Sequence, residues 1–459
     1  MKYLLCLNVD YHVVEFFKKY KITLDSKISL KVKSILKISV YYIFLYSQVL
    51  FSQPEWESGF ILTDSVHSLN IKTCMLTPLE SLIDFPLINM NSSERLLLQF
   101  DDFNFDSEDY MYSITHCNSD WSVSDLHFTE YIDGFPENYI QTFNFSFNTK
   151  VSYVHYELIL PNSDFRFIKS GNYVLTVYDT EQSEIPIFTK RFMVYDDKLF
   201  VGAKVQQSTL AKGRYKDHEI DVTVNFGNID YVNPINDVHL SIYQGHRWDN
   251  AITNLTPSFV ERKRLVYDFE EESSFGAGNE YRFFDTKSVR FYTERVQEII
   301  RDTVDIVLLY PDFPWANQAY SFIPDIEGYF VPNILERDDA QIQADYVWVN
   351  FCLKQNPFLE NGNLYLFGAL TDWNIKEEAK LNYDERMGCY ETSLLLKQGY
   401  YNYTYLFIPE DTQLASQEAV DGHFHQTSQD YYIFVYLYDY DYGYDRLLGF
   451  RKISTRGMF

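Results

Sequence analysis

The sequence has little positive charge, few cysteines and no long apolar segment. Its 39 Lys and Arg residues stand against 65 Asp and Glu residues, so the formal net charge is −26 at pH 7. A chain this acidic repels the phosphate backbone of nucleic acids, and no basic stripe along the sequence offsets that charge. The composition therefore excludes a nucleic-acid partner.

Metal-binding and disulfide patterns are also scarce. Cys6 lies near the N-terminus, and the other four cysteines are Cys74, Cys117, Cys352 and Cys389. None has the C-x-x-C spacing of a zinc site, so we expect no metal and no cofactor. Bridges inside single predicted domains would join Cys74 to Cys117 and Cys352 to Cys389. Free, buried thiols are the preferred alternative, because a chain this long does not need disulfides to stabilise its cores.

The longest apolar run near the N-terminus, residues 38–51, is shorter than the about 20 residues that span a membrane as a helix. It follows three lysines between residues 31 and 37 and ends at Ser52. This is the pattern of a secretory signal peptide. We predict a leader at 1–52 that is cleaved after Ser52, with cleavage after Ser47 and an uncleaved anchor as alternatives. The predicted consequence is an exported protein with no direct membrane span.

Aromatic residues are abundant, at 18% of the chain, with 39 Tyr and 37 Phe against 6 Trp. Large flat side chains pack well on the pleated surface of a β-sheet. The length of 459 residues corresponds to about three domains of roughly 150 residues each. We therefore predict an all-β chain of tandem immunoglobulin-like β-sandwich domains.

Turn residues separate the β-patterned runs and divide the chain. The runs of the first predicted domain are 71–77, 95–100, 110–116, 143–147, 153–160, 172–178 and 187–194. Those of the second are 201–205, 220–225, 238–243, 265–269, 281–284 and 304–308, and those of the third include 346–353, 362–367, 389–396 and 400–407. The predicted organisation is a leader at 1–52, sandwich domains at 53–196, 197–311 and 344–459, and a linker at 312–343 that packs between domains.

Tyrosines and aspartates alternate over residues 436–445. Because side chains alternate between the two faces of a strand, this pattern predicts one strand with an aromatic face and an acidic face. At a sheet edge, the aspartates would discourage pairing between molecules.

The densest cluster of specific polar residues is 110–134, which we call the signature segment. Period two places the even-numbered residues from Tyr110 to His116 on one face of a strand, and the odd-numbered residues from Met111 to Cys117 on the other. The candidate site residues of the segment are His116, Cys117, Asn118, Asp120, Trp121, Tyr131, Asp133 and Gly134.

The end of this strand carries the chemistry of a tight turn. Asn118 and Asp120 have short polar side chains that bond their own backbone, and Trp121 follows as a bulky anchor. His116, Cys117 and Asp120 have the residue types of a base, a nucleophile and an orienting acid, but they are too close in sequence to converge without an unusual bend. We interpret the segment as a sandwich strand and a long connection held by a buried tryptophan, and the protein as not an enzyme.

A second polar turn lies at 245–250 and holds His246, Arg247, Trp248 and Asp249 together. A tryptophan and an arginine on one turn could bind a sugar or a protein partner. A packed turn with a surface ion pair is the preferred interpretation.

Three groups of short stretches together resemble one family, the type IX secretion system plug proteins of Gram-negative bacteria. The stretches are 112–121 with 130–135, 249–252 with 281–285, and 421–424 with 435–436 and 444–449. The first reads Y-S-I-T-H-C-N-S-D-W and then E-Y-I-D-G-F, and it is the most specific. The leader is longer than this family leads us to expect, and the Tyr/Asp run after Val435 replaces a more basic strand end.

The resemblance implies a periplasmic protein of several immunoglobulin-like domains. Its partner would be the outer-membrane translocon β-barrel of the secretion system, and its work would be steric closure of the periplasmic opening, without chemistry. The residues themselves indicate an exported, acidic, β-rich chain and do not reveal the translocon.

A carbohydrate-binding protein is the main alternative. Residues 364–374, 388–390 and 397–403 resemble the starch- and glycogen-binding modules of the early-set immunoglobulin type. Trp373 is the candidate sugar-binding residue, and stacking on a sugar requires that its face be exposed to solvent. A glycosidase is a further alternative, but sequence alone cannot select two carboxylates that lie roughly 5 to 10 Å apart.

Overall fold

Most of the regular structure is β-strand, as the aromatic-rich alternating runs predict. The computed structural model describes residues 62–104, 106–180, 185–231, 233–253, 255–355, 359 and 361–458. The predicted leader at 1–52 and its cleavage site lie outside the described residues. Residues Ser58–Phe459 form one unit, and within it the strands assemble into three modules.

The first module holds two sheets that share one core. Its elements are β1 (Ser65–Val66), β2 (Ile71–Pro78), β3 (Leu87–Asn89), β4 (Leu96–Asp102), β5 (Tyr110–Cys117), α3 (Phe128–Tyr131), β6 (Ile132–Gly134), β7 (Glu137–Tyr139), β8 (Thr142–Phe145), β9 (Val154–Leu160), β10 (Phe165–Phe167), β11 (Gly171–Asp179) and β12 (Pro186–Tyr195). One sheet has the order β1-β12-β11-β5-β7 with β3 beside β12, and the other has the order β2-β4-β9-β8. A small ribbon pairs β6 with β10. All seven predicted runs of this region are strands.

The second module contains a five-stranded and a three-stranded sheet. Its elements are β13 (Phe200–Gln207), β14 (Asp217–Asn225), α4 (Pro234–Asp237), β15 (Val238–Gln244), β16 (Phe259–Glu261), β17 (Arg264–Tyr267), β18 (Ser274–Gly276), β28 (Asp430–Asp439) and β29 (Tyr444–Ser454). The larger sheet has the order β13-β14-β17-β16 with β18 beside β14, and the smaller has the order β15-β28-β29. Apolar residues of both sheets, among them Ile220 and Ile433, form its core.

The third module is built on a nine-stranded sheet. Its elements are β19 (Arg282–Asp285), β20 (Val296–Ile300), β21 (Ile306–Leu309), β22 (Phe330–Pro332), α5 (Ala340–Gln343), β23 (Tyr346–Leu353), β24 (Gly362–Phe367), η1 (Ala369–Thr371), η2 (Glu377–Ala379), β25 (Lys380–Asp384), β26 (Cys389–Lys397) and β27 (Gly399–Pro409). The strand order is β19-β27-β24-β25-β26-β23-β21-β20, with β22 beside β27. A disulfide between Cys352 and Cys389 joins β23 to β26, with 5.8 Å between their Cα atoms.

Strand pairing crosses the domain boundaries that the sequence predicts. β28 and β29 fall in the predicted third domain, yet β28 pairs with β15 of the second module. In return, β19 and β21 fall in the predicted second domain, yet they pair with β27 and β23 of the third module. Alternation in a sequence shows which face of a strand is buried, but it does not show which strand lies beside it. The second and third modules are therefore each built from separated parts of the chain.

Two detailed predictions need correction. Residues 436–445 do not form one strand: β28 ends at Asp439, a turn follows, and β29 begins at Tyr444. Tyr436 and Tyr444 are buried, whereas Tyr440 and Tyr442 in the turn are exposed.

The second correction concerns the cysteines. The pairing of Cys74 with Cys117 is wrong, because both are free and buried. Cys74 lies in the core of the first module, whereas Cys117 faces the second module. The pairing of Cys352 with Cys389 is confirmed. The preferred alternative of free, buried thiols thus holds for one pair and fails for the other.

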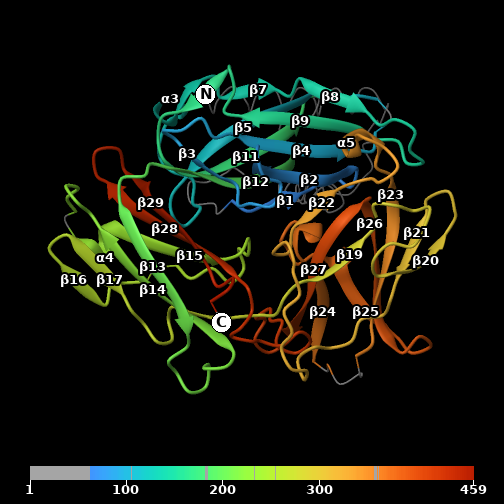
Figure 1. Cartoon of the computed structure of the whole chain (residues 1–459). Coiled ribbons are helices and arrows are strands. Elements are labelled where there is room, and N and C mark those ends of the chain that lie inside the picture. The colour runs from blue at the N-terminus through green and yellow to red at the C-terminus, as the bar shows by residue number, and fades with distance from the viewer. Residues whose placement is uncertain are drawn as a thin grey trace, which may run out of the picture. The chain divides into compact units, whose positions relative to one another are not determined.

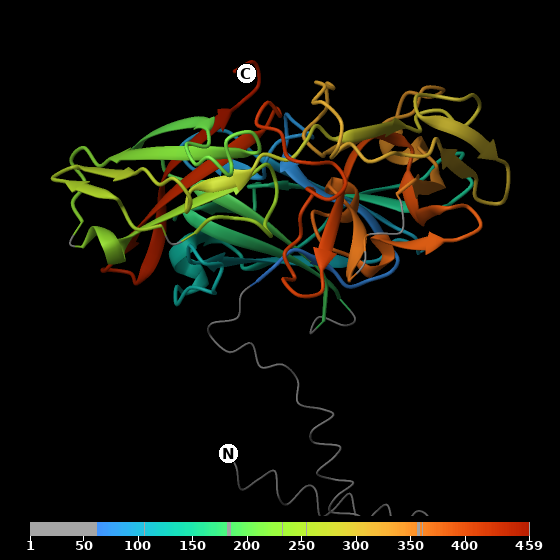
Figure 2. The same cartoon turned by 90° about the horizontal axis from the view of Figure 1, so that it is seen from below.

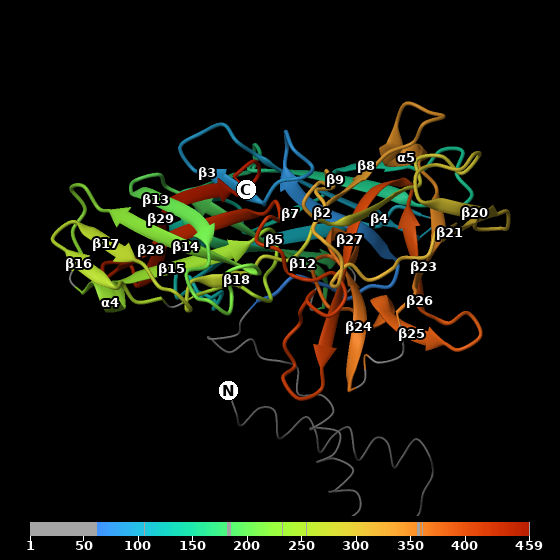
Figure 3. The same ribbon diagram turned by 60° about the horizontal axis from the view of Figure 1, so that its bottom comes forward.

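The first module lies across both of the others in Figure 1. Seen from below in Figure 2, the second module, in green and red, lies beside the third, in orange, with the first module behind them. The intermediate view of Figure 3 shows the second module on the left and the third on the right. The first module contacts the second where β11 and β12 meet β29. Among the described residues, no helix is long and apolar enough to span a membrane.

Candidate functional site

The strand of the signature segment has the two faces that the sequence predicts. Tyr110, Tyr112 and Ile114 lie in the core of the first module. Cys117, at the end of the strand, belongs to a separate apolar cluster with residues of the second module. Burial raises the pKa of the Cys117 thiol to about 12, so the thiol stays protonated and unreactive.

The predicted turn follows and is closed by backbone hydrogen bonds. The Trp121 amide donates to the Asn118 carbonyl at 3.0 Å, and the Asn118 amide donates to the Ser122 carbonyl at 2.8 Å. The backbone and hydroxyl of Ser119 both donate to the carboxylate of Asp445, at 3.0 and 2.7 Å. Because Asp445 belongs to β29, this turn attaches the first module to the last hairpin of the chain.

Trp121 is the buried anchor of this contact. Its indole is 6% exposed and meets the Trp248 ring edge-to-face, with 5.4 Å between the ring centroids. Its Nε1 donates to the Tyr243 hydroxyl at 3.3 Å. The Arg191 guanidinium lies over the Trp248 ring at 3.9 Å, within the range of a cation–π contact. Trp121 is thus buried between the first and second modules, outside the core of its own module.

His116 and Tyr131 have structural positions inside the first module. The His116 imidazole contacts the Ser124 hydroxyl at 2.9 Å and the Ser170 carbonyl at 3.3 Å. Burial lowers its pKa to about 4, so the ring is neutral at pH 7. A Cβ on Gly171 would come within 2.3 Å of the His116 ring, so only glycine fits there. The Tyr131 hydroxyl donates to a backbone carbonyl of β5 at 3.1 Å.

The remaining candidate residues are spread over the surface of the segment. Asp120 is exposed and accepts from the Ser122 amide at 2.9 Å, closing the turn. Asp133 forms an exposed ion pair with Arg166 at 2.6 Å. Gly134 has a φ of +146°, and a Cβ there would come within 2.2 Å of the Asp164 carbonyl oxygen. These residues do not converge on one point, and His116 and Cys117 lie on opposite faces of β5.

The turn at 245–250 is packed rather than presented to solvent. His246 and Arg247 are buried, and Arg247 pairs with Asp249 at 2.5 Å. The preferred interpretation of a packed turn agrees with this burial, although the arginine lies inside the protein and not on its surface. The ring of His246 stacks on Trp373 of the third module, with 5.4 Å between centroids. The turn therefore lies where all three modules meet.

Trp373 does not offer the exposed face that sugar stacking requires. It is 6% exposed and packs among Tyr281, Tyr329, Phe367 and His246. The sugar-binding role of Trp373 that its neighbouring sequence suggests is therefore wrong. Its ring fills the junction between the second and third modules.

The first and third modules are joined by charged side chains that the sequence analysis did not single out. Lys397 Nζ lies 2.6 Å from Asp101 Oδ2, and both side chains are fully buried. Asp101 also accepts from the Tyr346 hydroxyl at 2.6 Å and contacts His155 Nδ1 at 2.6 Å. Burial opposes ionisation of Asp101, but Lys397 and His155 outweigh it and hold its pKa below the usual value.

A second ion pair joins the same two modules. Lys190 of β12 contacts Asp372 at 3.1 Å, and Asp372 also pairs with Lys376. Burial again opposes ionisation, yet the two lysines keep the pKa of Asp372 below its usual value. A charged residue inside an otherwise apolar strand must have a partner. Lys190 within β12 and Lys397 after three leucines were the signals that could have revealed these contacts.

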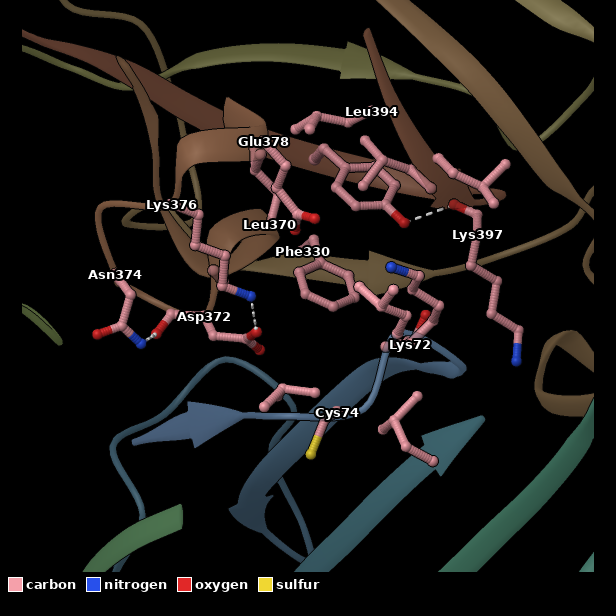
Figure 4. Close-up of a pocket in the computed structure, with 18 of the residues that line it drawn as sticks. Lys72, Cys74, Phe330, Leu370, Asp372, Asn374, Lys376, Glu378, Leu394 and Lys397 are labelled. Carbon is pink, nitrogen blue, oxygen red and sulfur yellow. Dashed lines mark hydrogen bonds and ion pairs between the residues drawn. The ribbon is translucent and has the colours of Figure 1, made fainter. Parts of the chain in front are cut away.

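A cavity of about 690 Å³ lies between the first and third modules beside this pair (Figure 4). In Figure 4, Lys72 and Cys74 project from the first module, and Phe330, Leu370 and Lys376 from the third. Burial raises the pKa of the Cys74 thiol to about 12, so it is not a nucleophile at pH 7. Among the described residues, no group of three or more His, Cys, Asp or Glu side chains could hold a metal ion.

Known proteins match most of the chain and, separately, the module that carries the signature segment. A hypothetical protein from Parabacteroides merdae ATCC 43184, known from a crystal structure, is similar at 31% identity and a TM-score of 0.83. The match covers 86% of this chain and 100% of that one. Residues 71–196 match the first domain of type 9 secretion system plug proteins. The chain belongs to the type 9 secretion system plug protein family.

The matched region of this plug-family chain spans β2 to the end of β12 and includes the whole signature segment. A partial N-terminal region of an enterococcal surface protein also aligns over 87% of this chain and 98% of its own. At 7% identity and a TM-score of 0.20, that alignment carries no argument. Among curated proteins, none matches. Membership of the plug family implies a structural component of the secretion system.

Proposed function

We propose that the chain is a non-catalytic component of the type IX secretion system that closes the periplasmic opening of the outer-membrane translocon barrel. The observation that carries this proposal is that the signature segment joins the first module to the second. Within the domain matched by the plug family, its distinctive residues Cys117, Ser119 and Trp121 attach one module to the next. A protein that closes an opening sterically must keep its modules together, and these contacts hold the first module to the second.

The proposal includes the class of each module and the location of the protein. We assign the paired sheets of the first and second modules to the immunoglobulin-like sandwich class, because two sheets enclose each core. We place the protein in the periplasm, exported by the predicted leader and attached to the translocon by protein contacts. Steric closure needs no nucleophile, metal or cofactor.

Affinity purification from outer-membrane extract tests the proposal. The tagged full-length protein in mild detergent should recover a very large β-barrel protein. Recovery of no barrel would contradict the assignment. Deleting the gene should increase the permeability of the outer membrane, and unchanged permeability would contradict closure while leaving barrel binding intact.

A further inference from the structure

The segment that follows the signature segment exposes an unusual number of aromatic rings. Its exposed aromatic residues, which we call the aromatic edge, are Phe135, Tyr139, Phe143, Phe145 and Phe147. They are between 40% and 70% exposed although they lie within thirteen residues of one another. Single exposed apolar residues are ordinary on protein surfaces, but contiguous ones mark interaction sites.

The same segment supplies an edge strand to each of the two sheets of the first module. β7 is the last strand of one sheet, and β8 is the last strand of the other. Within the described residues, no strand pairs with the outer side of either. An edge strand with unpaired backbone N–H and C=O groups is a template for pairing with another chain. Both strands lie at the upper edge of the first module in Figure 1, away from β16 and β17 of the second.

Phenylalanines occupy every second position in β8 and just after it, which is the spacing at which a strand presents side chains to an added strand. Phe143 and Phe145 are two residues apart in β8, so they share one face of the strand. Phe147 follows two residues after the end of β8 and is 63% exposed. The rings of Phe143 and Phe145 contact each other edge-to-face, with 6.0 Å between centroids. We call Phe143, Phe145 and Phe147 the stripe. The Phe147 amide donates to the Ile342 carbonyl at 2.8 Å, which attaches the end of the stripe to α5.

Charge indicates what kind of chain fits this edge. Between residues 135 and 147 the only charged residue is Glu137, whereas the chain as a whole carries a net charge of −26. Two copies of such an acidic chain repel each other, so the neutral edge is poorly suited to pairing with a second copy. A partner strand with few carboxylates would not be repelled by the negative charge of this chain.

We infer that the aromatic edge is the surface on which the chain docks to its translocon partner. The segment it fits is an extended strand of that partner with apolar side chains on one face and few acidic residues. The strand adds to β8 by main-chain hydrogen bonds, and its alternate side chains pack against Phe143, Phe145 and Phe147. This inference rests on the proposed function, and it adds where on the molecule the contact is made.

The test compares two triple variants of the full chain in the purification from outer-membrane extract. Phe143→Ser, Phe145→Ser and Phe147→Ser together remove the stripe. Phe200→Ser, Phe259→Ser and Tyr292→Ser are the matched control, since these aromatics are 68%, 64% and 65% exposed on the other modules. The stripe variant should recover at least about tenfold less barrel than the wild type, because several anchor side chains are lost. The control should recover as much as the wild type.

A photo-crosslinking residue at position 145 tests the same contact without removing the stripe. It should crosslink to the barrel, and the same residue at position 259 should not. Equal recovery by wild type and stripe variant, or no barrel crosslink at position 145, would overturn the inference and leave the proposed function standing. A crosslink to a second copy would overturn it as well. Wild type that recovers no barrel would overturn both.

Discussion

The first module is joined to its two neighbours by contacts of opposite chemistry. Toward the second module the buried contact is mainly aromatic: Trp121 packs on Trp248, and Cys117 lies in the same cluster as Phe434 and Tyr436. Toward the third module the contact is ionic, with Lys397 on Asp101 at 2.6 Å and both side chains fully buried. The same module thus uses apolar burial on one side and paired charge on the other.

The difference predicts how each junction fails. An apolar contact loses free energy in proportion to the area and volume that a mutation removes. A buried ion pair contributes little net stability when intact, but removing one partner leaves an unpaired charge in the interior. The ionic junction should therefore be the more sensitive of the two to a single substitution, and the aromatic junction the less sensitive to salt.

The largest effect is expected from Lys397→Met. This change removes the lysine that faces the buried Asp101 carboxylate and leaves only His155 beside it, at 2.6 Å, so the free energy of unfolding should fall by about 3 kcal/mol. Urea denaturation followed by tryptophan fluorescence measures the loss. Lys150→Met is the matched control, because Lys150 also pairs across to the third module, at 2.6 Å from Asp305, but its side chain is 40% exposed.

The control should lose less than about 1 kcal/mol, because Lys150 is partly exposed and Asp305 keeps a second cation, Arg301, at 2.9 Å. The double variant Lys397→Met with Asp101→Asn should recover part of the loss, because no net charge is then left without its partner. A Lys397→Met variant as stable as the Lys150→Met control would contradict the ionic description of this junction.

Trp121→Ala should have the next largest effect. Removing the indole opens a cavity against Trp248 and leaves the Tyr243 hydroxyl without its donor, so about 3 kcal/mol of stability should be lost. Trp348→Ala is the matched control, because Trp348 is 41% exposed and its loss should cost less than half as much. Equal losses for the two variants would show that Trp121 is not an anchor.

His246 makes stability at the aromatic junction depend on pH. Burial first, and then Lys190 and Arg191, lower its pKa from 6.5 to about 3 in the folded protein. The unfolded state therefore binds a proton more readily, so the contribution of this histidine is complete above pH 6.5 and is lost as the pH falls toward 3. Between pH 7 and pH 5 the loss amounts to about 2 kcal/mol.

Unfolding measured at both pH values in wild type and His246→Phe tests this. Phenylalanine keeps the stacking on Trp373 but cannot take up a proton. The variant should therefore lose about 2 kcal/mol less than the wild type over this range. An identical loss in both proteins would mean that His246 is not held neutral by the fold.

The smallest effect is expected within the signature segment itself. Asp133 pairs with Arg166 at 2.6 Å, but both side chains are more than half exposed. Asp133→Asn should change the free energy of unfolding by less than about 1 kcal/mol. A loss comparable to that of Trp121→Ala would show that the exposed part of the segment also holds the fold together.

Much of this fold follows from local sequence patterns. The alternation in β5 predicts which side chains are buried, and the short polar residues Asn118 and Asp120 predict the turn, because both signals depend only on neighbouring residues. The packed turn at 245–250 also agrees with its preferred interpretation.

Contacts between distant residues could not be predicted in the same way. Asp101 and Lys397 are 296 residues apart, and no periodicity relates them. The exchange of strands between the second and third modules could not be predicted for the same reason, since β15 could pair with any strand of matching face. The sequence predicts the burial of Trp121, but it does not predict the contact with Trp248, which lies on a distant turn.

The central claim is that the signature segment couples the first module to the second, and a double-mutant cycle tests it most directly. Trp121→Leu, Trp248→Leu and the double variant are each unfolded in urea, and the coupling free energy is taken from the difference between the double and the two single losses. We predict a coupling of about 1 kcal/mol, as for a buried aromatic pair. Strictly additive losses would contradict the account.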